Sequence, residues 1–114
     1  MMFRLRYLLQ MLRWLLPRSR LLPPAGIGAR VQVRVLAGTT PALEVVKDWN
    51  GAWRVSDGVA DLDQYGVGTN ATMMHVAIHD DTIPALMQKM TPGTVAYRPN
   101  PVTPWKVSSL ARDE

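Results

Sequence analysis

Apolar and polar residues alternate with a period of two in several short stretches of the chain, which is the pattern of half-buried β-strands. In residues 30–36, Val31, Val33 and Val35 would share one face and polar residues would occupy the other. Similar β-type stretches predict further strands at 42–48, 52–57, 72–79, 94–98 and, after Pro104, within 102–110. Glycine and proline separate these stretches, so we expect short strands joined by turns.

The dipeptide Asn50-Gly51 lies between two of these predicted strands and is a strong signal for a β-hairpin. Because both residues accept a positive φ, we expect a type I′ turn centred on them, which would place Val46 opposite Val55. Residues 57–70 combine three glycines with three aspartates and predict a long loop. The spacing of these aspartates does not match a calcium-binding loop.

A helical period appears only once in the second half of the chain. Ile83, Leu86, Met87 and Met90 recur at i, i+3, i+4 and i+7, which predicts a short helix over 81–90 with this stripe facing the core. These segments together predict an α+β domain at 25–114. Its mostly antiparallel sheet would have five or six strands, or curl into a small half-open barrel, with this one helix inserted.

The first 24 residues differ from the rest, and we interpret them as a basic amphipathic helix followed by a Pro-rich linker. Residues 3–16 contain no Gly or Pro, and Leu16 precedes Pro17, which should end the helix. Polar residues form one stripe on this helix and apolar residues cover an unusually wide face. The residues expected to dock on a membrane or a partner are Phe3, Arg4, Arg6, Leu8, Leu9, Leu12, Arg13, Trp14 and Leu15.

The interruptions at Gln10 and Arg13 argue against a transmembrane span, which needs about 20 apolar residues. They also argue against a secretory signal, so we expect a cytoplasmic or peripheral membrane protein that is not secreted. An organellar presequence fits the arginine-rich, acid-free and amphipathic character, but the segment contains only one serine. Packing of the helix on its own domain and a translation start at Met11 remain open alternatives.

Charge is distributed unevenly along the chain. Residues 1–34 contain seven arginines and no acid, whereas residues 35–114 contain six basic and nine acidic residues and have a net charge of −3. A domain that grips nucleic acid normally carries its Lys and Arg on the folded face, so this distribution counts against that function. The balance of glycine, proline and arginine is typical of a high-GC bacterial or phage genome.

Residues with catalytic or ligating chemistry are few. The chain has no cysteine, and it contains no phosphate-binding or dinucleotide-binding motif. On a strand, His75 and His79 would lie about 13 Å apart, too far to share one metal ion. We therefore expect no catalytic residue, no metal and no cofactor.

Three functions remain as hypotheses. The leading one is a non-catalytic docking or assembly module, a small accessory subunit anchored by residues 3–16 to a membrane surface or a larger protein complex. The alternative is a nucleic-acid-binding protein that uses the arginine-rich helix and surface contacts from Trp49, Trp53 and Trp105. The third is a small hydrolase-like enzyme that uses His75 or His79.

Overall fold

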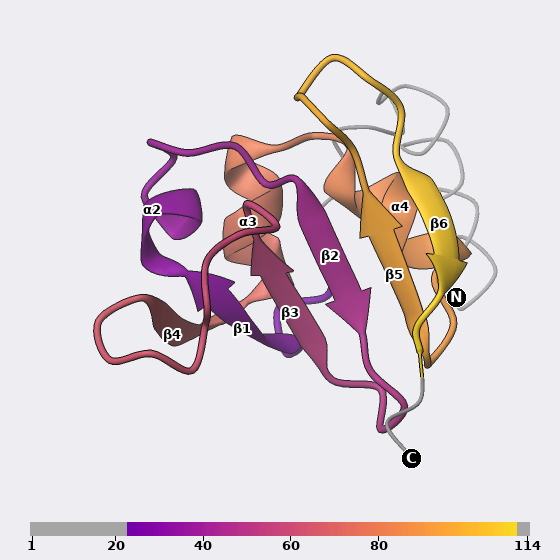
Figure 1. Ribbon diagram of the computed structural model, residues 1–114, viewed down its shortest axis with the longest axis horizontal. Coiled ribbons are helices and arrows are strands. Elements are labelled where there is room, and N and C mark those ends of the chain that lie inside the picture. Colours follow the sequence, from indigo (N-terminus) through magenta and orange to yellow (C-terminus); the bar gives the residue numbers. More distant parts are fainter. Residues whose placement is uncertain (1–22, 112–114) are drawn as a thin grey trace, which may run out of the picture.

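The computed structural model describes residues 23–111, which form an α+β domain built on one six-stranded mixed sheet (Figure 1). The helix expected over 3–16 lies outside the described residues. Strands follow the spatial order β4-β1-β3-β2-β5-β6, so β4 and β6 are the edges. Their bounds are β1 Gly28–Gln32, β2 Glu44–Lys47, β3 Trp53–Ser56, β4 Gly68–Thr72, β5 Thr94–Tyr97 and β6 Lys106–Ser109. The helices are α2 Val33–Leu36, α3 Met73–His79 and α4 Ile83–Lys89.

Four of the five strand pairs are antiparallel, and β1 with β3 is the parallel pair. One register row crosses the sheet through Val31, Val55, Val45 and Ala96, and all four side chains are fully buried. Helices α3 and α4 cover this face (Figure 1). At about 1.5–3 kcal/mol for each fully buried aliphatic side chain larger than alanine, this row is a principal source of stability.

The hairpin at Asn50-Gly51 forms, but its register differs by one residue from the predicted one. Val55 pairs with Val45 instead of Val46. Gly51 has a positive φ of 84°. All described residues with positive φ are glycines, so Asn50 does not have the positive φ that a type I′ turn requires at its first central position. Gly51 N donates to Asp48 O and Asp48 N donates to Ala52 O, which makes a three-residue loop with a glycine bulge.

The strand predicted at 30–36 is wrong in its second half, because β1 ends at Gln32 and α2 follows. Val31 and Val35 are buried as expected, while Val33 is 42% exposed. A single helical turn also places residues four apart on one side, so the alternation of valines does not distinguish the two structures. The side-chain amide of Gln32 is hydrogen-bonded to Asp57, and Val33 N donates to Val67 O, which draws the chain away from the strand path.

The strand predicted at 72–79 is also wrong, because these residues form α3 and the strand precedes them as β4. Met73, Val76 and Ala77 are buried at the i, i+3, i+4 spacing, and Ile78 is exposed. Thr72 caps the helix, since its Oγ1 accepts a hydrogen bond from His75 N at 3.4 Å. The predicted loop at 57–70 is correspondingly shorter, because β4 takes its last three residues.

The prediction for α4 is confirmed. Ile83, Leu86 and Met90 are buried, and Met87 packs against the core from a partly buried position. Thr82 is the N-cap residue, so the helix begins at Ile83, two residues later than predicted. The strands expected at 94–98 and after Pro104 are confirmed as β5 and β6.

Within 23–111, no helix has the length and apolar content that a membrane span requires.

Candidate functional site

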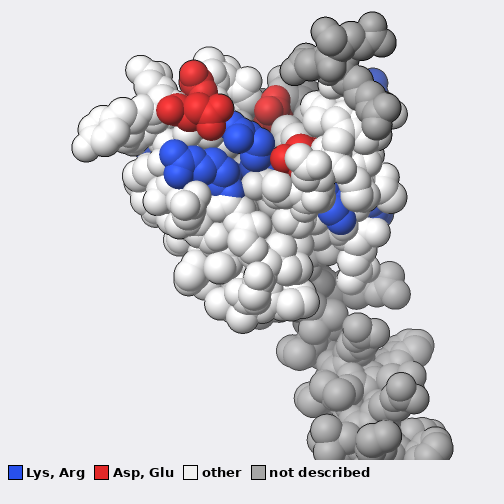
Figure 2. All heavy atoms as spheres, turned by 90° about the horizontal axis from the view of Figure 1, so that it is seen from below, with Lys and Arg blue, Asp and Glu red and all other residues white. Residues whose placement is uncertain are grey.

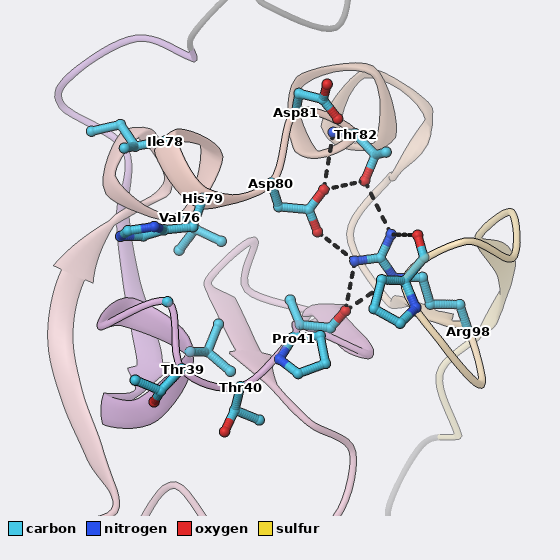
Figure 3. A pocket seen from close by; sticks show the side chains of 14 residues that line it. Thr39, Thr40, Pro41, Val76, Ile78, His79, Asp80, Asp81, Thr82 and Arg98 are labelled. Carbon is cyan, nitrogen blue, oxygen red and sulfur yellow. Dashed lines mark hydrogen bonds and ion pairs between the residues drawn. The ribbon is translucent and has the colours of Figure 1, made fainter.

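An open cleft of about 650 Å³ lies where the loop 38–42, the C-terminal end of α3 and the link from α3 to α4 meet the turn after β5 (Figure 3). Its walls are partly apolar, with Val35, Pro41, Val76 and Ile78 among the lining residues. Polar side chains come from His79 to Thr82 and from Arg98. The cleft therefore combines apolar walls with a small set of charged groups, which is the usual composition of a ligand site.

Arg98 lies beside this cleft and is only 3% exposed. Its Nε and one Nη2 hydrogen are donated to Ala42 O at 3.0 and 2.9 Å. Nη1 donates to Thr82 Oγ1 at 3.4 Å and to Pro101 O at 3.3 Å. Nη2 also donates to Asp80 Oδ2 at 2.5 Å. All five N–H groups of the guanidinium thus have acceptors within the chain, which leaves none for a ligand.

Asp80 and Thr82 extend this arrangement to the edge of the sheet. Asp80 Oδ1 accepts hydrogen bonds from the backbone N–H and the hydroxyl of Thr82, at 3.0 and 2.6 Å. Thr82 Oγ1 in turn accepts from Trp105 Nε1 at 2.8 Å, and the guanidinium of Arg98 lies 4.1 Å from the centroid of the Trp105 ring. We call Asp80, Thr82, Arg98 and Trp105 the clamp, because they fasten the α3–α4 link to β5 and to the start of β6.

The sequence does not predict the clamp, although it contains one signal for the burial of Arg98. Ala96 faces the core, so a period of two places Arg98 on the same side just after β5 ends. A buried arginine requires a carboxylate and several hydrogen-bond acceptors. Nothing in the sequence indicates that Asp80, 18 residues away, supplies that carboxylate.

The uncommitted polar groups of the cleft lie nearer its rim. The side chain of Asp81 is exposed, and no ion pair or hydrogen bond to it is found within 23–111. His79 is exposed and lies against Gly38, where an added Cβ would come within 2.8 Å of the imidazole Nδ1. Because Asp80 neutralises Arg98, the carboxylate of Asp81 gives the cleft a net charge of −1 when His79 is neutral.

The two histidines stand four residues apart on α3, not on a strand as expected. His79 lines the cleft, whereas the Nδ1 of His75 lies 3.1 Å from the Oγ1 of the capping Thr72. Among the residues that the structure describes, no three His, Asp or Glu side chains are grouped so that they could hold a metal ion.

The three tryptophans proposed as surface contacts have different environments. Trp53 belongs to the buried core at 7% exposure, with the ammonium group of Lys47 at 4.9 Å from its ring centroid. Trp105 is partly buried in the clamp. Trp49 is 46% exposed and packs on Gly93. The docking residues expected within 3–16 lie outside the described part of the chain.

The sheet face opposite α3 and α4 carries charges of both signs. Arg54 forms an ion pair with Asp63 at 3.2 Å, and Arg30 donates to Leu62 O and Asn70 Oδ1. Figure 2, seen from below, shows a small group of Lys and Arg side chains with Asp and Glu side chains directly beside it. On the surface visible in this view, the basic side chains do not form the continuous footprint that phosphate backbones require.

Two carboxyl groups, on Glu44 at the start of β2 and on Asp57 directly after β3, have pKa values shifted in opposite directions. Partial burial, with a smaller effect of the nearby Asp57 charge, raises the pKa of Glu44. Backbone N–H groups of Ala60 and Val59, and then the Gln32 amide, hold the pKa of Asp57 below its usual range, although partial burial opposes them. The carboxylate of Asp57 thus organises the start of the 57–67 loop.

Comparison with protein families, with curated proteins and with solved structures finds no significant match to this chain.

Proposed function

We propose that this protein is a non-catalytic docking module, a small accessory subunit that attaches to a membrane surface or a larger assembly through residues 3–16 while its folded domain contacts a partner. The observation that carries the proposal is the state of Arg98. The guanidinium of Arg98 is buried, neutralised by Asp80 and fully hydrogen-bonded inside the fold. Such a group stabilises a preformed surface and has no donor left to bind or polarise a substrate.

The anchor is supported by the sequence. Its five arginines without an acid, beside a wide face of leucine and aromatic residues, suit a helix lying in the interface of an anionic membrane. We favour peripheral attachment from the cytoplasmic side, because basic segments are attracted to the anionic cytoplasmic leaflet. The domain at 25–114, whose net charge is −1, would then face away from the lipid, held off by Pro23-Pro24.

Sedimentation with lipid vesicles tests the anchor. The whole chain should sediment with vesicles that contain phosphatidylglycerol, and a chain lacking residues 1–22 should stay in the supernatant. Circular dichroism of the shortened chain shows whether the domain remains folded. A folded, shortened chain that sediments as well as the whole chain would show that residues 1–22 are not the anchor.

The nucleic-acid alternative stays a prediction, and the described residues offer it little support. Trp53 is buried, Trp105 is engaged in the clamp, and one face of Trp49 is occupied by Gly93. If the arginine-rich segment nevertheless binds phosphates, the affinity for a single-stranded oligonucleotide should fall steeply as salt increases.

A further inference from the structure

We propose that the cleft beside the clamp receives a basic side chain, an arginine or a lysine, from an extended segment of a partner protein. This inference rests on the proposed docking function and names the chemistry that the folded domain recognises. It depends on three properties of the cleft: the charge of its rim, the apolar character of its walls and the absence of a usable donor on Arg98.

The charge of the cleft favours a ligand group of positive charge. Arg98 and Asp80 form a buried ion pair and cancel each other. Asp81 follows directly and its carboxylate is exposed at the rim, so the remaining field in the cleft is negative. An anionic ligand would have to approach this carboxylate while all five N–H groups of the nearest cation are already donated. A cationic group meets neither obstacle.

The walls determine the shape of the ligand. Pro41 and Ile78 lie at the mouth of the cleft, and Val76 lies deeper, with 1% exposure. Figure 3 shows His79 and Ile78 at the left, Thr40 and Pro41 below them, and Asp80 and Asp81 to the right of His79. Lysine and arginine have a long methylene stem that packs on apolar surface and a charged head that stays at a polar rim. Such a side chain matches these walls with the head at Asp81.

The floor of the cleft is preorganised, because the clamp fixes Asp80 and Thr82 from β5 and β6. A ligand therefore does not have to order these groups when it binds, which reduces the entropic cost of association.

Peptide titration of the isotope-labelled whole chain, followed by amide NMR, tests this inference. The probe is an acetylated, amidated pentapeptide with a central arginine between alanines, and its control carries citrulline, which has nearly the same shape and no charge. The arginine peptide should shift the amide signals of Gly38, Thr39, His79 and Asp81. It should bind about three- to tenfold more tightly than the citrulline peptide, the range expected for one partly exposed charge pair.

The Asp81→Asn variant should abolish this preference for arginine, and Asp61→Asn should keep it. Asp61 is an exposed aspartate in the 57–67 loop, away from the cleft, whose Oδ1 accepts from Asp63 N, and asparagine can replace that acceptor. Both variants should still sediment with vesicles, so that loss of the peptide preference is separated from failure of the anchor. Equal affinity for the two peptides, tighter binding of a glutamate peptide, or an unchanged preference in Asp81→Asn would overturn the inference.

Discussion

The indole ring of Trp49 packs directly on Gly93, so closely that a Cβ on Gly93 would lie 2.5 Å from the ring atoms Cε3 and Cζ3. The backbone of Gly93 also donates to Lys47 O at 2.8 Å and accepts from Leu110 N at 2.8 Å. Gly93 thereby joins the β2–β3 hairpin to the start of β5 and the end of β6. The tryptophan that the sequence offered as a surface contact is thus partly a structural residue.

Replacing Gly93 with alanine should lower the free energy of unfolding more than the same change at Gly51. Both glycines have positive φ, at 81° and 84°, but nothing lies within 4 Å of a Cβ built at Gly51. The strained backbone should cost about 1–3 kcal/mol at either position, and displacement of the Trp49 ring should add about 1 kcal/mol or more at Gly93. Urea unfolding of both variants measures the difference. Equal losses would show that the Trp49 contact has no energetic weight.

Removal of one partner of the clamp should destabilise the domain severely. Arg98→Ala leaves the carboxylate of Asp80 with 13% exposure and without its cation, which should cost about 3–5 kcal/mol. Because that loss could unfold so small a domain, Arg98→Lys is the more informative variant. Lysine keeps the charge but lacks the planar guanidinium with its five donors. We therefore expect urea unfolding to show a free energy of unfolding that is lower by about 1–3 kcal/mol. A lysine variant as stable as the parent would contradict the account of the clamp.

The carboxyls of Glu44 and Asp57 should affect the pH dependence of stability with opposite signs. Glu44 has a raised pKa in the folded state, so it costs stability as the pH rises above its unfolded value of about 4.3. Glu44→Gln should therefore stabilise the domain at pH 7 and have little effect at pH 3.

Asp57 has a lowered pKa in the folded state, so its contribution to stability is present at neutral pH and is lost as the pH falls through the folded value. Asp57→Ala should destabilise at pH 7 and have a smaller effect at pH 2. Urea unfolding across this pH range measures both effects on the free energy of unfolding. The prediction for Glu44 is wrong if Glu44→Gln destabilises the domain most at pH 7.

Patterns of hydrophobicity predicted the strands β2, β3, β5 and β6 and the core stripe of α4, because each has one clear period. They failed at α3. The β-type residues of 72–79 predicted a strand, but Met73, Val76 and Ala77 make a buried helical stripe, and Ile78 is exposed. A seven-residue segment contains too few repeats to distinguish the strand period of 2.0 residues from the helix period of 3.6 residues. The cap from Thr72 favours the helix.

The candidate site could not be predicted in the same way. The cleft is formed by segments that are distant in the sequence. The guanidinium of Arg98, for example, donates hydrogen bonds to the backbone carbonyl of Ala42, 56 residues earlier. The antiparallel pairing of β2 with β5, which sets Glu44 opposite Tyr97, brings these segments together, and no local pattern encodes it. What the sequence did indicate is the uneven charge and the amphipathic character of residues 3–16.

The most direct test of the docking account is the partition of point variants between water and vesicles containing phosphatidylglycerol, measured by sedimentation of the whole chain. Leu8→Ala combined with Leu12→Ala removes apolar surface from the predicted anchor without changing its charge, and Gln10→Ala changes only its polar stripe. We expect the double variant to lose at least about tenfold in partition coefficient and Gln10→Ala to stay within about twofold. If the double variant partitions like the parent chain but unfolds at lower urea, the helix packs on its own domain and is not the anchor.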